Sequence, residues 1–233
     1  MDRAWTWFQE NQKQIIWGTG TVLVVGVAIG FFYWKKIDTE HSAGAALSAV
    51  EAQRMLPGGQ RSESAEAFLK VASEHAGTQA AARALLLGAG ALFVEGKYAD
   101  AQTQFQKFLG DHADNPLRGQ ALLGVAACLD AQGKTEEAAV AYKNVVDRHP
   151  GEAVLSPAKF ALARLYEAQG KLDQAVKLYE ELSRGEAAGS IANEAGLKAQ
   201  ELRAKLPPVE TLTASPAVPP VLAAPSVAPT NAP

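Results

Sequence analysis

The sequence contains a single cysteine, Cys128, and this scarcity removes several classes of protein from consideration. One cysteine cannot form an internal disulfide, and a cysteine-rich metal site is excluded as well. Basic residues are also few, because the part of the chain after residue 36 holds 18 Lys and Arg against 23 Asp and Glu. A nucleic-acid-binding surface needs clustered Lys and Arg. We therefore expect no nucleic-acid partner.

The sequence also lacks the residue patterns that carry enzyme chemistry. No phosphate-binding glycine loop follows a predicted strand, and no base is placed to activate Cys128, which we interpret as a small buried residue. Glu136-Glu137 and Glu180-Glu181 are adjacent pairs that face different ways on a helix, so we expect them to be solvated. We predict no catalytic residue, no metal, no cofactor and no small-molecule substrate.

Proline is scarce except at the end of the sequence. Residues 207–233 hold eight of the twelve prolines and one charged residue, Glu210. Such a composition cannot form a helix or a packed core. The segment is therefore predicted to be a disordered, extended tail.

Charged residues are absent from residues 15–34, IIWGTGTVLVVGVAIGFFYW. Twenty helical residues measure about 30 Å, the thickness of the hydrocarbon core of a bilayer, and Trp17, Tyr33 and Trp34 lie at the two edges, where aromatic rings prefer the headgroups. A cleavable signal peptide is one alternative, but its apolar region is shorter and ends in small residues. A buried helix of a soluble protein is another, which four glycines would weaken. We predict an uncleaved transmembrane helix in contact with lipid.

Two features flank or lie within this predicted anchor. In residues 1–14, Trp5 and Phe8 are three positions apart, which on a helix gives an aromatic edge suited to a membrane interface; the alternative is a disordered stub. Gly26 and Gly30 have the G-x-x-x-G spacing that lets a second helix approach closely. They are candidate contacts for another transmembrane helix, and the alternative is a passive anchor.

An internal repeat follows the anchor. The pairs Gly96-Lys97, Gly133-Lys134 and Gly170-Lys171 recur every 37 residues, and Gly59 lies one further period back. Fixed self-similarity at such a period is typical of a solenoid. Other columns share it: Ala101, Ala138 and Ala175, five residues after the last three glycines, and Phe68, Phe105, Tyr142 and Tyr179, nine residues after each glycine.

Each repeat is predicted to be a pair of antiparallel helices. The glycine makes the turn between them, the alanine lets the helices lie close together, and the aromatic side chain fills the space between units. Other residues predict helix boundaries: Asn115-Pro116 and Ser156-Pro157 as N-cap and first helical residue, Thr78 and Thr135 as further N-caps, and Pro150 as a stop. Residues 191–206 are predicted to form a final covering helix, with Glu194, Lys198, Glu201, Arg203 and Lys205 on its exposed face.

Three histidines, His75, His112 and His149, also follow the period. Equivalent positions in successive repeats lie on successive units and cannot converge on one metal ion. We expect each histidine to end the second helix of its unit, where an imidazole suits the negative end of the helix dipole.

The repeats resemble the tetratricopeptide repeat family. The segment LLGVAACLDAQGKTEEAAVAYKNVVDRHP matches that family's pattern in order, through Leu122, Val125, Ala126, Leu129, Gly133, Ala138, Tyr142, Val145 and Pro150. The units on either side match less completely, and the first is degenerate because Ser64 occupies the alanine column. The resemblance implies an all-α solenoid of about four helix pairs over residues 38–206.

A narrower resemblance covers most of the chain. The WFQEN foot, one anchor ending in aromatic and lysine residues, and a degenerate four-unit array are similar to the ancillary subunit family of the SecYEG translocon. That family implies a single-pass bacterial inner-membrane protein with periplasmic repeats that cooperates with translocon components and envelope chaperones. The proline-rich segment 207–233 departs from it. Charge alone gives no orientation, since Arg3 and Lys13 balance Lys35 and Lys36 across the predicted span.

The resemblance also implies a protein-binding groove, formed by the non-core positions of the first helices. A partner segment would be extended or helical and apolar; the alternative is that these side chains pack against the first unit or the final helix. The candidate positions are Arg83, Leu86, Phe93, Gln120, Leu123, Asp130, Phe160, Arg164 and Glu167.

The sequence therefore predicts a membrane-anchored, non-catalytic adaptor that binds other proteins in protein translocation or chaperone hand-over. Two alternatives share the architecture. One is an envelope-assembly or division scaffold, in which the tail reaches a distant partner. The other is a lateral structural subunit of a large membrane complex, with Gly26 and Gly30 as its chief contact.

Overall fold

The computed structural model describes residues 12–55, 61–148, 153–185 and 189–206, with side chains described from Leu23 onward except those of residues 54–64. Within these ranges the chain forms nine helices and no strand, which confirms the predicted all-α fold. The helices are α2 Gln12–Met55, α3 Arg61–Glu74, α4 Gln79–Val94, α5 Tyr98–Asp111, α6 Arg118–Ala131, α7 Thr135–Arg148, α8 Leu155–Ala168, α9 Leu172–Arg184 and α10 Ser190–Lys205.

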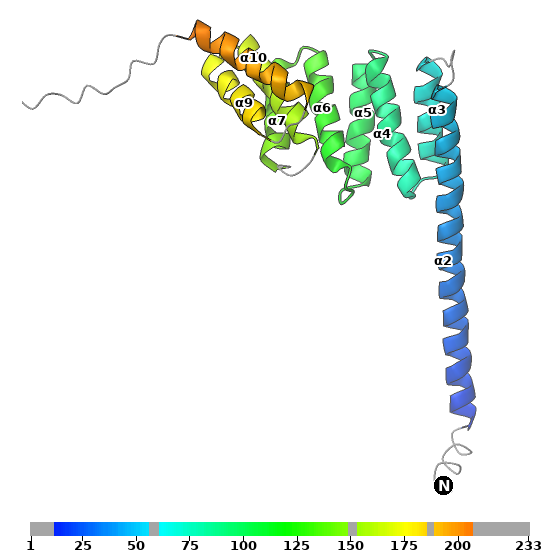
Figure 1. Cartoon of the computed structure of the whole chain (residues 1–233). Coiled ribbons are helices and arrows are strands. Elements are labelled where there is room, and N and C mark those ends of the chain that lie inside the picture. The colour runs from blue at the N-terminus through cyan, green and yellow to red at the C-terminus, as the bar shows by residue number, and fades with distance from the viewer. Residues whose placement is uncertain (1–11, 56–60, 149–152, 186–188, 207–233) are drawn as a thin grey trace, which may run out of the picture.

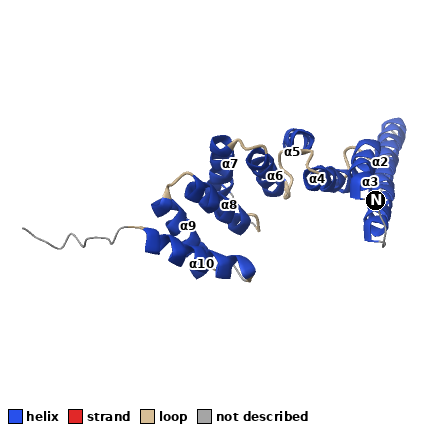
Figure 2. Cartoon of the chain, turned by 90° about the horizontal axis from the view of Figure 1, so that it is seen from above, coloured by secondary structure: helices blue, strands red, loops and turns tan. Residues whose placement is uncertain are grey.

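Helices α3 to α10 stack in sequence order into a row that runs sideways from one end of α2 (Figure 1). Each helix packs on its neighbours in the sequence, and α4 also contacts α6 while α8 contacts α10. The same row is seen from above in Figure 2. The pairs α4/α5, α6/α7 and α8/α9 are three of the four predicted repeats, and the C-terminal part of α2 with α3 takes the place of the first. Helix α10 covers α9 as the final helix. The predicted tetratricopeptide-type solenoid is therefore confirmed.

The repeated glycines make the turns inside these pairs, as predicted. Gly96, Gly133 and Gly170 have φ angles of 78°, 75° and 73°, a left-handed conformation that a side chain disfavours. In the first turn, Lys97 N–H donates to the Leu92 carbonyl at 3.0 Å and Gly96 N–H to the Phe93 carbonyl at 3.0 Å, and the other two turns repeat this bonding. This is the Schellman motif, which satisfies carbonyls at a helix end.

The periodic alanine and aromatic columns form the core. Ala101, Ala138 and Ala175 are fully buried, because the two helices of a pair meet at these positions. The four aromatic side chains of the second column are at most 7% exposed, and each packs in a cluster of apolar side chains from neighbouring helices. The core is thus a chain of linked clusters along the row of helices.

The predicted helix starts are confirmed at one position and corrected at others. Thr78 caps α4, because its hydroxyl accepts from Ala81 N–H at 3.0 Å. Asn115 accepts from Leu117 N–H at 2.9 Å, but α6 begins only at Arg118.

Ser156 is not an N-cap, and Thr135 is already the first residue of α7. The N-cap of α8 is Val154, whose side chain is buried in the core. Pro157 still fits the first turn, where backbone N–H groups have no helical partner.

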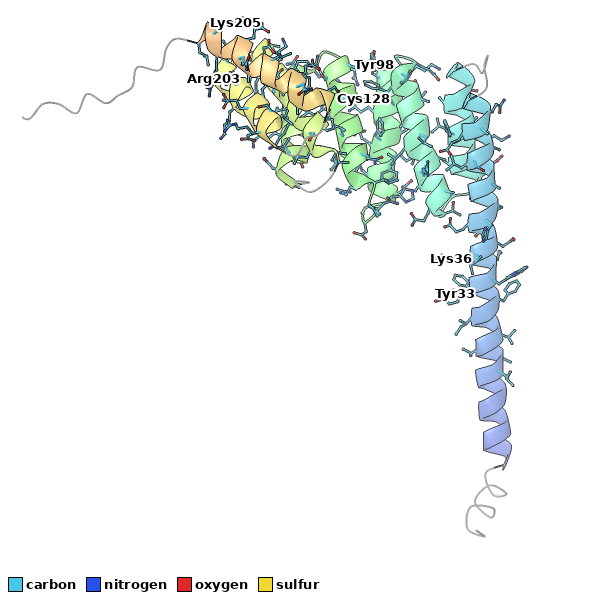
Figure 3. The ribbon with its side chains drawn as sticks, in the orientation of Figure 1. Tyr33, Lys36, Tyr98, Cys128, Arg203 and Lys205 are labelled. Atoms are coloured by element: carbon cyan, nitrogen blue, oxygen red, sulfur yellow. The ribbon has the colours of Figure 1, made fainter. Side chains whose placement is uncertain are left out.

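Helix α2 has two parts with different surroundings. Near its C-terminal end, Ala43 and Leu47 are buried where α2 contacts α3 and α4, and the Glu40 carboxylate accepts from Gln79 N–H at 2.9 Å. The rest of α2 stands clear of the solenoid (Figure 1), and Tyr33 and Lys36 project from it (Figure 3). Among the described residues, no helix is long and apolar enough to cross a membrane.

Several sequence predictions fall outside the described residues and stay predictions. They are the foot at residues 1–14, apart from the backbone of its last three residues, the side chains of residues 15–22, the turn of the first repeat at Gly59, His149 with Pro150, and the tail at residues 207–233.

Candidate functional site

The nine candidate binding residues lie on α4, α6 and α8, and we call this set the α4–α6–α8 surface. These helices are the first members of their pairs, as predicted. Gln120, Arg83 and Arg164 are exposed, whereas Asp130 and Glu167 are half-buried. The surface is therefore polar at its outermost side chains.

The four apolar members of the α4–α6–α8 surface are largely covered by the protein itself. Leu86 is 8% exposed and belongs to the core cluster of α3 to α6. The Phe93 ring lies 5.2 Å from the Tyr98 ring, and the Phe160 ring lies 5.5 Å from the Tyr179 ring, edge-on. Leu123 packs against the next cluster. Phe160 also packs against the cluster that includes α10, as the packing alternative predicted for this residue.

The charged members form ion pairs with neighbouring first helices. Arg83 of α4 pairs with Glu51 of α2 at 3.1 Å, and Arg164 of α8 pairs with Asp130 of α6. Among the side chains that the structure describes, the Arg164–Asp130 pair is the only ion pair that joins two of the nine predicted residues. These bonds link α2 to α4 and α6 to α8, so the surface is held by polar contacts between repeats.

Glu167 connects the surface to the end of the solenoid. Its carboxylate accepts from the Tyr179 hydroxyl at 3.3 Å and lies 3.5 Å from the Lys198 ammonium of α10. Arg203 of α10 pairs with Glu180 of α9, and its place near the far end of α10 is seen in Figure 3. Glu180 is thus paired and only 17% exposed at its side chain, which corrects the prediction that it is simply solvated.

Sequence reasoning missed Glu51 and Lys198 as members of this network. The signal that could have found them is a spacing slightly shorter than the repeat: the bonded partners are 32, 34 and 31 residues apart in the pairs Glu51–Arg83, Asp130–Arg164 and Glu167–Lys198. The partner of a residue therefore does not lie 37 residues further along the chain, at the equivalent position of the next unit. It lies about one helical turn before that position.

The periodic histidines end their helices where the structure describes them. His75 directly follows α3, and His112 is the C-cap of α5, with its ring 5.0 Å from the Phe108 ring. Both positions are as predicted. Among the described residues, no three His, Cys, Asp or Glu side chains gather in a way that could hold a metal ion.

Cys128 is fully buried within α6, as predicted (Figure 3). Burial raises the pKa of its thiol from 9.0 to about 11, because the thiolate would lose its hydration. The folded state therefore holds this proton more tightly than the unfolded state. The stability that results is complete below pH 9 and is lost as the pH rises toward 11.

We expect this thiol to make the protein sensitive to alkaline pH. Between pH 8 and pH 10.5, the native protein should lose about 1–2 kcal/mol more unfolding free energy than Cys128→Ala. Urea unfolding of both proteins at the two pH values measures this difference. Burial also raises the pKa of Tyr142 and Tyr179, and their contribution to the loss is present in both proteins, so the comparison isolates the thiol. Equal losses would mean that the thiol is not buried.

Comparisons with known proteins identify the repeats. Residues 5–141 match the family described as "Tetratricopeptide repeat-like domain", and residues 129–201 match "Tetratricopeptide repeat". A search of curated proteins found no match. Neither family match specifies the ancillary SecYEG subunit family, which remains a proposal.

Solved structures of repeat proteins are similar to this chain. A putative kinesin light chain from Podosopora anserina with nearly identical TPR-like repeats is 17% identical, with a TM-score of 0.55 over 69% of this chain and 84% of that one. PcrH from Pseudomonas aeruginosa is 23% identical, with a TM-score of 0.47 over 54% of this chain and 93% of that one. At 17% identity, the similarity to the kinesin light chain concerns the fold alone. Because the first family match spans more than half of the sequence, the chain belongs to the tetratricopeptide repeat-like domain family.

Proposed function

We propose that this chain is a membrane-anchored, non-catalytic protein–protein interaction module, with residues 15–34 as the anchor and the solenoid as the binding part. The observation that carries the proposal is a solenoid built on one end of a long helix, in which residues 23–34 are exposed and uncharged. Stacked helix pairs offer an extended surface to partners. The α4–α6–α8 surface is the part of the solenoid that we assign to partner binding.

The anchor is supported by the exposed apolar side chains of α2. Leu23, Val24, Val27 and Phe32 are between 67% and 70% exposed in the described part of the helix. A helix that is apolar on all sides needs a protein core or a membrane around it. The apolar run of the sequence continues N-terminally to Ile15. The family match begins at residue 5, so it includes this run together with the first repeats.

The polar network of the α4–α6–α8 surface indicates the kind of partner. Arg83 is 61% exposed and Arg164 is 58% exposed at the side chain, although both are paired. The Glu51 partner of Arg83 is itself 33% exposed, and such an ion pair contributes little stability, so a partner can exchange it for its own charges at small cost. Phe93, Leu123 and Phe160 are only half-buried, so a partner segment is expected to carry both charges and apolar groups.

The location and the partners rest on the sequence resemblance. We place the N-terminus in the cytoplasm and the repeats in the periplasm of a bacterial inner membrane, where the chain would act in protein translocation or chaperone hand-over near the translocon.

Membrane retention tests the anchor. With Val24→Arg and Val27→Arg, we expect the full chain to move from the membrane pellet to the supernatant after alkaline carbonate extraction. Ten Ile, Val, Leu and Phe residues in the run contribute roughly −3 to −6 kcal/mol, and two arginines near the centre cost roughly 5–7 kcal/mol. The native chain should stay in the pellet.

The matched control for this test places the same charges on the solenoid. Val94 and Val140 are 66% and 71% exposed, close to the 70% and 67% of Val24 and Val27. With Val94→Arg and Val140→Arg, the chain should remain in the pellet. If both double variants partition alike, residues 15–34 are not a membrane anchor.

A lateral structural subunit is the second candidate, and one observation favours it. A Cβ at Gly26 or Gly30 would meet nothing within 4 Å, so this side of α2 is open to another helix. Purification in mild detergent separates the two functions. Loss of co-purifying proteins with Gly26→Leu favours the lateral subunit, whereas loss with Asp130→Arg favours the interaction module.

A further inference from the structure

A groove of about 440 Å³ lies between α7, α8 and α9, outside the α4–α6–α8 surface. Its floor is apolar and includes Val146, Leu155, Leu162, Tyr166 and Leu178. Leu162 is 3% exposed, and the other four are half-buried. The floor therefore keeps apolar area in contact with solvent.

Four of the five charged side chains at the rim of the α7–α9 groove are paired within the protein, and Lys177 of α9 has no ion pair among the described residues. Lys143 and Asp147 of α7 form an ion pair at 2.7 Å, and Lys159 of α8 pairs with Glu181 of α9 at 2.8 Å. The paired side chains satisfy one another, so among the rim side chains only the Lys177 ammonium group is left to attract a charge on the ligand. The attraction that the groove offers is burial of its apolar floor. The ligand that fits it is apolar and nearly uncharged.

The end of the described chain lies next to this groove. Helix α10 packs on α9 and α8, and Leu206, the residue after α10, is half-buried against the cluster of α8, α9 and α10. The 27 residues of segment 207–233 follow directly. At about 3.1 Å per residue, this segment can extend roughly 80 Å. That is several times the diameter of a helix, about 10–12 Å, so the segment is long enough to reach the groove from Leu206.

The composition of segment 207–233 matches the groove. It has eight prolines, Val and Leu between them, and one charged residue, Glu210. Prolines preset an extended backbone, so less conformational entropy is lost on binding. Grooves that bind such segments have an aromatic side chain among apolar ones. Tyr166 fills this role, with Lys171 placed 5.7 Å from its ring centroid.

From these observations we propose that residues 207–233 bind in the α7–α9 groove of the same chain. The bound segment covers the apolar floor and leaves the α4–α6–α8 surface open. An apolar, proline-rich segment of another protein has the same chemistry and would compete for the groove.

Cysteine cross-linking in the full chain tests this contact. In a Cys128→Ala background, Ala223→Cys in the tail is combined with Gln174→Cys at the groove. The control pair combines Ala223→Cys with Asp100→Cys, which occupies the same repeat position on α5, two units away. Gln174 and Asp100 are both exposed, so their thiols have similar access.

We expect a short bismaleimide to join the Gln174→Cys pair at least tenfold faster than the Asp100→Cys pair, as intramolecular product. Adding Leu178→Glu on the floor should remove the difference. Equal rates for the Gln174→Cys and Asp100→Cys pairs would refute the contact. Because the tail is tethered nearer to Gln174 than to Asp100, proximity alone also favours the first pair. The effect of Leu178→Glu is therefore decisive, and a rate at Gln174→Cys that this substitution leaves unchanged would also refute the contact. Products linked between two molecules would also refute it, since the occupant would then be a second copy.

Discussion

Replacing Gly124 by alanine is expected to lower the free energy of unfolding by about 1–3 kcal/mol, although alanine is the better helix former. Gly124 lies in α6, where a Cβ would be placed 2.5 Å from the Cζ atom of Phe105. The Phe105 ring is 7% exposed and belongs to the α3-to-α6 core, so it cannot move aside freely. Urea unfolding followed by circular dichroism measures the change.

Gly90 provides a matched control for this substitution. It lies inside α4, and a Cβ there would meet nothing within 4 Å. Gly90→Ala should therefore raise the unfolding free energy by about 0.5–1 kcal/mol through helix propensity alone. A double-mutant cycle of Gly124→Ala with Phe105→Leu should show coupling of about 0.5–3 kcal/mol, because the smaller side chain removes the clash. Equal stability of the Gly124→Ala and Gly90→Ala variants would contradict the close approach of α5 and α6.

Sequence reasoning correctly predicted those features that depend on the type of a single residue. A turn with positive φ requires glycine, so Gly96, Gly133 and Gly170 could be located by their repetition. A close helix crossing requires a small side chain, and the space between units requires a large one. Because the unit recurs every 37 residues, each requirement places the same type of residue at equivalent positions, and these could be recognised in the sequence.

Helix starts were harder to predict because several residues compete for them. Asn115 and Ser156 have the same Xaa-Pro pattern, yet α6 begins after the first and α8 before the second. Burial of Val154 in the core decides the start of α8, and a local pattern does not contain that information. The close approach of Gly124 to Phe105 was not predicted either, since it depends on how two helices are placed in space.

The candidate surface was predicted only in part for a related reason. Repeat columns assign residues to the correct helices, but they do not give the axial shift between one helix and the next. Glu51 therefore was not recognised as the partner of Arg83, nor Lys198 as the partner of Glu167. Once the shift of about one turn is known, the partners follow from the sequence.

Tyr179→Ala is expected to cost about 3–5 kcal/mol of unfolding free energy. The Tyr179 side chain is 1% exposed, and it packs between α8, α9 and α10 in a cluster with Val176, Leu182 and Leu202. Its ring also meets the Phe160 ring edge-on at 5.5 Å. Truncation to alanine removes all of these contacts and leaves a cavity. Urea unfolding gives the total loss.

Tyr179→Phe separates packing from hydrogen bonding at this position. The hydroxyl donates to the Glu167 carboxylate at 3.3 Å, a long hydrogen bond, so its loss should cost no more than about 1 kcal/mol. If Tyr179→Phe were as destabilising as Tyr179→Ala, the polar contact and not the ring would hold the end of the solenoid.

The loss in Tyr179→Ala should also be local. Units of a solenoid contact only their neighbours, so a weakened last unit can open while the earlier ones stay folded. Hydrogen exchange should therefore speed up in α9 and α10 and remain nearly unchanged in α3 and α4, whose core is built around Phe68 and Leu85. Uniform acceleration across all helices would mean that the stack unfolds as one cooperative unit. In that case the folding of the whole α4–α6–α8 surface would depend on Tyr179, and not only the folding of α8, which is paired with the helix that carries Tyr179.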